Sequence, residues 1–336
     1  MAATDIQHIS IIGAGAWGTA LAEIFSRAGR DVVLYARSAD LAAQINGSHE
    51  NTAYLKGFPL DLRLIATAEM ALAVKDAQLV VLATPAQHLR VTLAQLAPHL
   101  PKGVPLVNAA KGIEIATGYL MSEVAAEVAP GHPYAVLSGP TFATEAVQGL
   151  PTAITLAATD TAAAERWATA LRGAAFRPYF SGDVIGVEIA GALKNVIAIA
   201  CGIIEGKQLG QNAKAAVITR GIAEIKRLGL KRGAKPETFL GLAGIGDLSL
   251  TCSSMTSRNY SLGVALGQGR ALKDILAERH SVAEGVSTAA AVAGYAQKHG
   301  ADMPICLAVQ AILQHGASVG DIVTKLLSRD LKSEEA

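Results

Sequence analysis

The sequence has few cysteines and little net charge, and both scarcities exclude classes of protein. The three cysteines, Cys201, Cys252 and Cys306, lie far apart without CxxC spacing, and their odd number leaves at least one unpaired. This usage argues against a disulfide framework and a zinc site, and it predicts reduced thiols in a cytoplasmic protein without a bound metal. A formal net charge of +1 leaves no electrostatic footprint for nucleic acid.

Long apolar runs and targeting signals are also scarce. The most membrane-like segment, 189–204, is too short to span a bilayer and contains Lys194. Residues 1–5 lack the basic and apolar regions of a signal peptide, and no run of Lys and Arg suits an anionic membrane. Hydrophobic residues make up 51% of the chain and charged residues 17%, which argues against disorder. We therefore expect a soluble chain without stable membrane insertion, long enough for two domains.

What the chain does have is a glycine-rich turn between an apolar run at 9–12 and an alanine-rich stretch at 19–28. Gly13, Gly15 and Gly18 follow the GxGxxG spacing. The first glycine permits a tight turn, the second lets backbone approach a pyrophosphate, and the third lets helix pack on strand. The motif alone is weak, because any tight turn can recruit glycine. Its position between a strand and a helix predicts dinucleotide binding.

Apolar runs alternate with helical stretches as far as residue 180, which predicts a right-handed, doubly wound parallel sheet of Rossmann type. The predicted strands, with the later ones in mixed orientation, are 9–12, 31–35, 79–83, 105–108, 134–138, 152–157 and 177–180. After Ser181 the strand pattern stops, and an apolar helix is predicted over 184–204 with Asp183 as its N-cap. Further predicted helices are 213–228, 236–242, 258–268, 271–279, 286–298, 306–315 and 319–327. The chain thus divides into an α/β Rossmann-type domain, 1–181, and an all-helical domain, 182–336.

Two polar segments follow predicted strands. Ligands of open α/β sheets lie beyond the carboxyl ends of the strands, so Lys111 in the segment 108–112 is a candidate ligand-binding residue. The alternative is a solvated surface lysine. The segment 138–145 is typical of a turn that feeds a helix, with Thr141 as N-cap. Its N–H groups could hold an anion or the nicotinamide amide, although a plain helix cap explains it equally well.

Two further segments lie in the helical half. Lys194 is in the middle of the long helix beside its apolar stripe, with small residues as neighbours, where a desolvated lysine can serve as an acid or base. A lysine that extends its ammonium group to water is the alternative. Asp247 is a glycine-flanked carboxylate, and the triplet 257–259 opens a helix with donors that suit a phosphate. An N-capped helix with a surface arginine explains the triplet as well.

Considered together, these segments resemble the NAD(P)-dependent glycerol-3-phosphate dehydrogenases of the bacterial biosynthetic type. The matching text covers nearly the whole chain and includes GAGAWGTALA, NAAKGIE, SGPTFATE, GALKNVIAIACGI, NAKAAVITRG, GIGDLSLTC, SRN and VAEGV. The resemblance implies reversible, NAD(P)H-dependent reduction of dihydroxyacetone phosphate to sn-glycerol 3-phosphate, which supplies glycerophospholipid synthesis. It also implies an active site between a Rossmann domain and a helical domain, and a possible homodimer.

The resemblance assigns roles to particular residues. Lys194 would be the acid/base, Asp247 would orient it, and Asn195 and Thr251 would support the catalytic site. The residues implied in substrate binding are Lys111, Gly139, Thr141, Lys194, Asp247, Ser257, Arg258 and Asn259. The residues implied in cofactor binding are Gly13, Gly15, Ala16, Trp17, Gly18, Arg37, Tyr54, Lys111, Ala143, Arg258, Val282 and Glu284.

The end of the second predicted strand departs from the NAD-binding pattern. NAD-selective Rossmann folds place an acid there to bind the ribose hydroxyls, whereas this strand ends in Tyr35, Ala36 and Arg37. Arg37 can pair with the 2′-phosphate of NADP, while Asp40 could still reach the ribose. We expect NADP(H) to be preferred and NAD(H) to be possible.

Two other functions remain open from the residues alone. The first is a related reductase of the ketopantoate or hydroxyisobutyrate type, and the phosphate-binding SRN triplet argues against it. The second is a non-catalytic NAD(P)-sensing protein. Retention of Lys194, Asp247 and Thr251 together argues against a sensor, because a sensor needs no proton donor.

Overall fold

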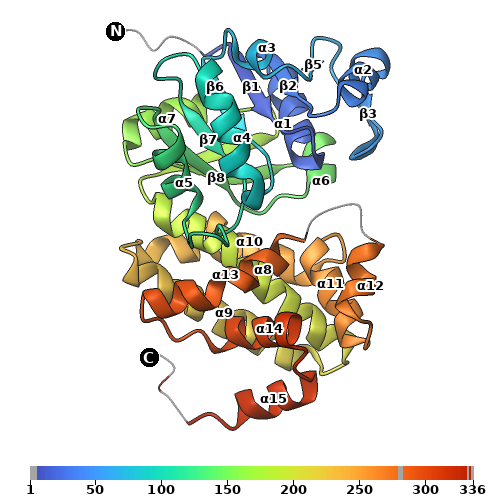
Figure 1. Ribbon diagram of the computed structural model, residues 1–336, viewed down its shortest axis with the longest axis vertical. Helices are drawn as coiled ribbons and strands as arrows, with labels where there is room; N and C mark the ends of the chain where they lie inside the picture. The colour runs from blue at the N-terminus through green and yellow to red at the C-terminus, as the bar shows by residue number, and fades with distance from the viewer. Residues whose placement is uncertain (1–5, 279–282, 331–332, 334–336) are drawn as a thin grey trace.

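The computed structural model describes residues 6–278, 283–330 and 333. An N-terminal half made of a β-sheet and its helices lies above a C-terminal half made of helices (Figure 1). The last strand ends at Ser181 and the long helix of the C-terminal half begins at Val184. Asp183 caps this helix as predicted, because its carboxylate accepts the backbone N–H of Gly186 at 2.9 Å.

The N-terminal half contains an eight-stranded sheet. Its strands, in spatial order, are β10 (Phe176–Ser181), β9 (Thr152–Ala157), β8 (Tyr134–Ser138), β7 (Leu106–Asn108), β6 (Leu79–Leu82), β1 (His8–Ile12), β2 (Asp31–Tyr35) and β5 (Ile65–Thr67). Neighbouring strands are parallel except β8 and β9, which are antiparallel. This confirms the doubly wound sheet and the mixed orientation predicted for its later strands.

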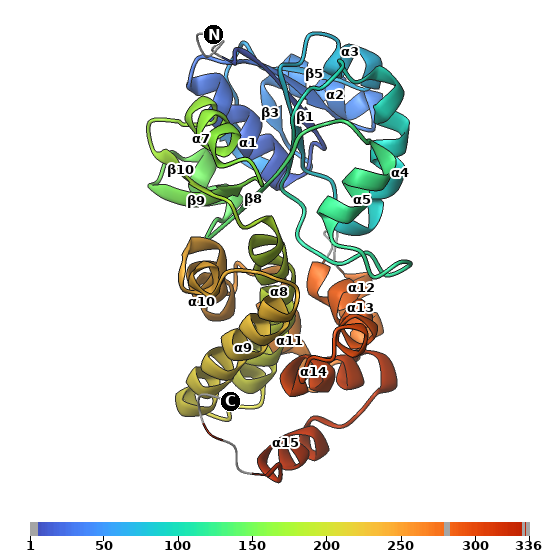
Figure 2. The same cartoon turned by 90° about the vertical axis from the view of Figure 1, so that its left-hand side faces the viewer.

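Helices cover both faces of the sheet (Figure 2). Ile9 and Ile11 of β1 pack in one apolar cluster with α1, α2 and α7, while Ile12 packs on the opposite face with α3, α4 and α5. Continuous apolar strands are typical of this arrangement, because both of their faces are buried. The helices are α1 (Ala16–Arg27), α2 (Ala39–Ser48), α3 (Met70–Val74), α4 (Leu89–Leu96), α5 (Met121–Val128), α6 (Ala143–Val147) and α7 (Thr161–Ala170), with 3₁₀ turns η1 (Ala86–His88) and η2 (Ala97–His99).

Three short strands were missing from the prediction. β5 pairs with β2 at the edge of the sheet, while β3 (Glu50–Asn51) and β4 (Leu55–Pro59) form a separate antiparallel pair. β3 and β5 have only two and three residues, and Lys56 and Gly57 interrupt the apolar residues of β4, so periodicity does not reveal these strands. The β3–β4 pair brings residues 50–59 close to the glycine-rich turn, as described below.

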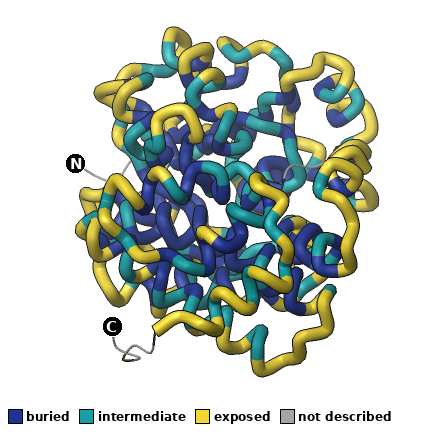
Figure 3. Tube along the Cα trace, turned by 60° about the horizontal axis from the view of Figure 1, so that its bottom comes forward, coloured by how far each residue is buried: buried dark blue, intermediate teal, exposed yellow. Residues whose placement is uncertain are grey.

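The C-terminal half is built around α8 (Val184–Gly206). The predicted single apolar stripe understates the burial of α8, because α8 packs in one core with α9, α10, α11, α13 and α14. The tube of Figure 3 shows that buried residues fill the interior of the molecule and exposed residues lie on its outside. The length argument from segment 189–204 was wrong, because the whole of α8, with 23 residues, is apolar and long enough to cross a membrane. However, 94% of its most apolar stretch is buried, as in a core helix. The surrounding helices are α9 (Gln211–Lys231), α10 (Asp247–Ser253), α11 (Arg258–Gly267), α12 (Leu272–Ala277), α13 (Glu284–Lys298), α14 (Pro304–His315) and α15 (Val319–Leu327).

Glycines allow α11 to lie against the backbone of α8. A Cβ at Gly202 would lie 2.1 Å from the carbonyl oxygen of Tyr260, and a Cβ at Gly263 would lie 2.2 Å from that of Ile199. Gly206 and Gly267 make the equivalent contacts one turn further along. This close packing fixes the start of α11 beside the middle of α8, where Lys194 lies.

Two local predictions were wrong. The helix predicted over 236–242 is a 3₁₀ turn, η3 (Pro236–Leu240), followed by a π-type turn, η4 (Leu242–Gly246). Thr141 does not cap α6, because Phe142 occupies the N-cap position and the Thr141 hydroxyl donates to the Gly139 carbonyl at 3.2 Å instead.

Helix α10 was not predicted at all, because glycines at 244 and 246 and several hydroxyl residues obscure its pattern.

Candidate active site

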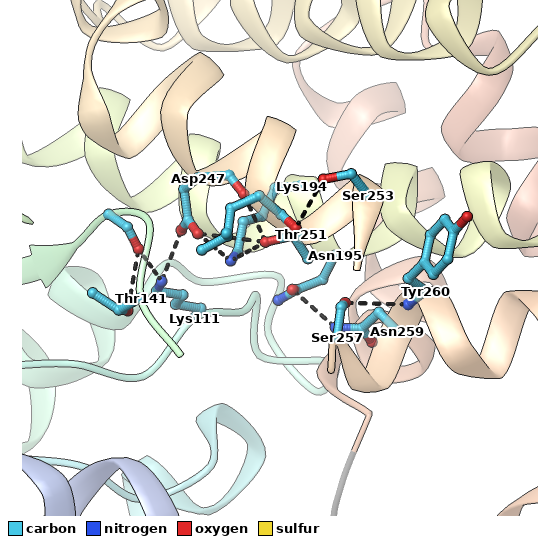
Figure 4. A network of polar contacts seen from close by, with 12 residues as sticks. Lys111, Thr141, Lys194, Asn195, Asp247, Thr251, Ser253, Ser257, Asn259 and Tyr260 are labelled. Atoms are coloured by element: carbon cyan, nitrogen blue, oxygen red, sulfur yellow. Dashed lines mark hydrogen bonds and ion pairs between the residues drawn. The ribbon is translucent and has the colours of Figure 1, made fainter. Parts of the chain in front are cut away.

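Three elements bring charged side chains together between the two halves (Figure 4). Lys111 comes from the loop that follows β7, Lys194 from the middle of α8 and Asp247 from the first turn of α10. Lys194 donates to Oδ1 of Asp247 at 2.5 Å, and Lys111 donates to Oδ2 of the same carboxylate at 2.8 Å. One aspartate therefore bridges two lysines from opposite halves of the molecule.

Thr251 completes the environment of Lys194. Its hydroxyl accepts from the Lys194 Nζ at 2.7 Å and donates to the Asp247 backbone carbonyl one turn earlier, at 2.6 Å. Asp247 is fully buried, and Lys194 and Thr251 are 7% and 5% exposed. The ammonium group is thus held by two oxygen atoms in a nearly dry site, and it does not reach bulk water as a surface lysine would.

Burial lowers the pKa of Lys194 from 10.5 to about 8. Desolvation is the largest cause, and the charge of Lys111 lowers the pKa further. The carboxylate of Asp247 acts in the opposite direction, because it favours the charged ammonium. A lysine in this environment changes its protonation state close to neutral pH, which suits it for proton transfer.

Lys111 also reaches the backbone of the segment after β8. Its Nζ donates to the carbonyl oxygen of Gly139 at 3.3 Å, and the Thr141 hydroxyl donates to the same oxygen. Lys111, Gly139 and Thr141 therefore lie together next to Asp247.

The predicted phosphate-binding triplet forms the start of α11. Ser257 caps this helix by accepting the N–H of Tyr260 at 3.2 Å. The Asn259 amide donates to the side chain of Asn195 at 2.9 Å and accepts the backbone N–H of Gly285 at 3.0 Å. Arg258 is exposed beside this network. The N-capping interpretation of Ser257 therefore holds, and it leaves the guanidinium at a helix N-terminus, where an anion is favoured.

The glycine-rich turn fits a dinucleotide. A Cβ at Gly13 or Gly18 would collide with backbone oxygens at 2.9 Å and 1.9 Å, and Gly13 has a φ of +119°, so both positions require glycine. A Cβ at Gly15 would meet no atom within 4 Å, which leaves this residue open at the N-terminus of α1. The open backbone and the helix N-terminus provide what a pyrophosphate needs.

The other predicted cofactor residues lie around this turn or across the interface. Ala16, Trp17 and Ala143 are partly buried and pack around one small apolar cluster. Arg37 is exposed after β2, and Tyr54 is 50% exposed between β3 and β4.

On the helical half, Glu284 begins α13 and accepts the backbone N–H of Ala86 at 3.4 Å. Burial raises the pKa of Glu284, while the charge of Arg258 lowers it. Val282 lies outside the described residues.

The sequence did not indicate several polar groups around the site. The hydroxyls of Thr84, Ser138 and Thr288 are buried, and no hydrogen-bond partner for them occurs in the part of the chain that the structure describes. Thr288 and Lys111 border a cavity of about 100 Å³ between η1 and α13. Ser138 is the last residue of β8, and Thr84 is the second residue after β6. A position at the carboxyl end of an apolar strand is the signal that could have revealed both. No group of three or more potential metal ligands occurs among the described residues.

A Rossmann-type sheet with a glycine-rich turn, together with a buried lysine and carboxylate between the two halves, is typical of a dinucleotide-dependent dehydrogenase. Comparison with known proteins narrows this class. The family models described as NAD-dependent glycerol-3-phosphate dehydrogenase N-terminus and C-terminus match residues 8–164 and 183–324. The chain belongs to the NAD-dependent glycerol-3-phosphate dehydrogenase family.

Individual relatives agree over almost the full length. The chain is 54% identical to a glycerol-3-phosphate dehydrogenase (NAD(P)+) of Rhodospirillum rubrum, over 98% of this chain and 94% of that protein. It is 52% identical to the enzyme of the same name from Parvibaculum lavamentivorans, over 98% of both. The crystal structure of glycerol-3-phosphate dehydrogenase from Coxiella burnetii superimposes with a TM-score of 0.92 at 36% identity, covering 96% of this chain and 99% of that one.

Proposed function

We propose that this protein catalyses the reversible reduction of dihydroxyacetone phosphate to sn-glycerol 3-phosphate with a nicotinamide dinucleotide. Membership of the family supports the proposed reaction. The cluster of Lys194, Asp247 and Lys111 between the two halves supports the proposed position of the active site. The bound nicotinamide supplies the hydride in the reduction and accepts it in the reverse reaction.

Lys194 is the proposed acid and base. In the reduction its charged Nζ polarises the substrate carbonyl and donates a proton to the forming alkoxide oxygen. In the oxidation the neutral amine removes the hydroxyl proton. Asp247 holds the Nζ in place and compensates its charge, while Thr251 restrains it from a second side.

The phosphate of the substrate belongs at the start of α11. Arg258 presents a guanidinium there, which can bind two phosphate oxygens at once, and the helix dipole adds to the attraction. Asn195 and Asn259 are joined by a hydrogen bond and complete this corner, with Ser257 as the cap. Lys111, Gly139 and Thr141 approach the substrate from the Rossmann half.

Arg37 underlies the proposed preference for NADP(H). It follows β2, where NAD-selective folds carry an acid, and its exposed guanidinium can pair with a 2′-phosphate. NAD(H) is proposed as a weaker alternative, because no carboxylate holds the ribose at residues 35–37.

Four further expectations accompany the reaction. We propose domains at 1–181 and 182–336, cytoplasmic location, and a role of the product in glycerophospholipid synthesis. A homodimer is a fourth proposal, which rests on the family resemblance alone.

Steady-state turnover with purified protein tests the proposal. We expect oxidation of NADPH on addition of dihydroxyacetone phosphate and none on addition of ketopantoate or an unphosphorylated hydroxy acid. Turnover of ketopantoate in place of dihydroxyacetone phosphate would contradict the proposed substrate. Binding of NADPH without turnover of any of these compounds would indicate a sensor.

A further inference from the structure

Asn51 lies beneath the glycine-rich turn and contacts its backbone. It is the last residue of β3, it is fully buried, and its amide Nδ2 donates to the carbonyl oxygen of Ala14 at 2.9 Å. The same Nδ2 donates to the Thr19 hydroxyl at 2.8 Å, and Oδ1 accepts the backbone N–H of Tyr54 at 3.1 Å. One side chain thus ties the turn to helix α1 and to the β3–β4 segment.

The bond to Ala14 sets the orientation of the next peptide group. In a trans peptide the C=O and the following N–H point in opposite directions. Because Asn51 holds the Ala14 carbonyl on the protein side, the Gly15 N–H is directed to the other side. The Gly15 Cα itself is uncrowded, since a Cβ built there would meet no atom within 4 Å, so a ligand can approach the backbone at this residue. Gly15 also precedes α1, so its N–H is among those that the helix leaves without internal partners.

We propose that Asn51 is a positioning residue for the dinucleotide: it holds the Ala14 carbonyl away from the pyrophosphate and presents the Gly15 N–H to it. This inference rests on the proposed use of a dinucleotide. A free carbonyl in this turn would repel a phosphate, whereas a fixed N–H binds it without further ordering. The β3–β4 segment is thereby part of the cofactor site although Asn51 itself points away from the ligand.

Isothermal titration of the folded protein with NADPH, NADH and adenosine 2′-phosphate tests this role. Asn51→Ala removes all three side-chain bonds, while Asn51→Asp keeps the acceptor for Tyr54 and loses the donor. For each variant we expect a roughly 10-fold or larger rise in Kd for NADPH and, by the same factor, for NADH. The Kd for adenosine 2′-phosphate should stay within about twofold, because this ligand has no pyrophosphate.

Asn46 provides the matched control. Its side chain also donates to a backbone carbonyl and accepts a backbone N–H, both of Ala66, at 2.8 Å and 2.7 Å, but it joins α2 to β5. Asn46→Ala should leave all three Kd values unchanged. Arg37→Ala should weaken NADPH and adenosine 2′-phosphate and leave NADH unchanged, because only the first two ligands carry a 2′-phosphate. This pattern is the reverse of the one expected for Asn51, so the two residues are distinguished by their ligands.

Three results would overturn the role of Asn51. Unchanged dinucleotide binding in Asn51→Ala would show that the turn holds its own conformation. An equal loss for adenosine 2′-phosphate would show that Asn51 supports only the domain. Weaker dinucleotide binding in Asn51→Asp but not in Asn51→Ala would show only that the new carboxylate repels the phosphates. If the wild-type protein binds neither dinucleotide, the proposed function fails instead, whatever Asn51 does.

Discussion

A charged amine held in a protein interior needs partners, and Lys194 has two of them from a single helix. Replacing Lys194 with alanine should lower turnover by roughly 10²–10⁴-fold, which is the usual contribution of a positioned acid together with its electrostatic effect. The Kd for NADPH should change little, because the glycine-rich turn lies in the other half. Stopped-flow turnover and titration on one protein sample measure both. Near-normal turnover in folded Lys194→Ala would remove the mechanism.

The lowered pKa of Lys194 makes a prediction about pH. Reduction requires the protonated amine, so its kcat should fall as the pH rises through about 8, while the kcat of oxidation should rise over the same range. Lys111→Met removes a neighbouring positive charge and should move both profiles to higher pH. Rate profiles in both directions from pH 6 to 10 measure this. Profiles that do not respond to Lys111→Met would show that the two lysines are not coupled.

Arg258 is the residue on which phosphate recognition depends. Arg258→Ala should weaken binding of dihydroxyacetone phosphate by roughly 1.5–3 kcal/mol, the range for hydrogen bonds to charged groups. Arg258→Lys should recover only part of this loss, because an ammonium group cannot bind two oxygens in parallel. The informative comparison is with unphosphorylated dihydroxyacetone. Equal losses for both ligands would mean that Arg258 does not bind the phosphate.

At the scale of whole elements, α8 packs closely against the Rossmann half because Gly191 has no side chain. A Cβ at Gly191 would lie 2.8 Å from the Ser138 hydroxyl, while the next atoms, in Lys111 and Ser138, are at 3.6 Å and 3.7 Å. This gap lets the end of β8 pack against α8 one turn before Lys194. We therefore expect a side chain at residue 191 to displace α8 from the end of β8, and with it the contact between Lys111 and Asp247.

Gly191→Ala should lower kcat/KM roughly 10–100-fold, because small displacements of catalytic groups are costly. Adding Ser138→Ala should restore most of the activity, since it removes the colliding oxygen. Gly294→Ala is the control, because a Cβ there meets nothing within 4 Å on α13. Kinetics of the single and double variants measure this, and a double variant no better than Gly191→Ala would contradict the steric explanation.

At the scale of the molecule, the interface between the halves contains a second buried network. Glu188 on α8 accepts from the Ser122 N–H and hydroxyl at 2.9 Å and 2.6 Å, and from the Tyr134 hydroxyl at 2.6 Å. Arg232, the residue directly after α9, pairs with Glu123 at 2.9 Å beside it. These contacts join α5 and β8 to the helical half, away from the Lys194 cluster.

Burial raises the pKa of Glu188 to about 7. The folded state then binds this proton more tightly than the unfolded state, so the stability it contributes is complete below about pH 4.5 and is lost as the pH rises through 7. Glu188→Gln carries no titrating proton and should reduce this loss by roughly 1–3 kcal/mol between pH 4.5 and 7.5. Urea unfolding at several pH values measures the slope. An unchanged slope would place the titration elsewhere.

Local patterns were enough to predict most of the architecture. Continuous apolar runs bounded by polar residues indicated the long strands, because a strand buried on both faces needs them. The GxGxxG spacing indicated the turn because each glycine answers a local steric demand. Asp183 was predicted as an N-cap for the same reason, since a cap depends only on its own helix. Thr141 failed because its hydroxyl had a competing backbone acceptor two residues away.

The partners of the functional side chains could be decided only by the tertiary structure. Lys194 bonds to a carboxylate 53 residues away, and Lys111 bonds to the same group 136 residues away. The apolar stripe beside Lys194 allowed either burial or extension to water, and only the family resemblance implied Asp247 as its partner. The contact of Lys111 with the same carboxylate was not predicted at all. The sequence likewise does not indicate a role for Asn51. That role depends on its hydrogen bond to the Ala14 carbonyl, which forms only when the β3–β4 segment packs against the glycine-rich turn. Propensity and periodicity are properties of neighbouring residues, whereas burial and long-range hydrogen bonds exist only once the elements have packed together.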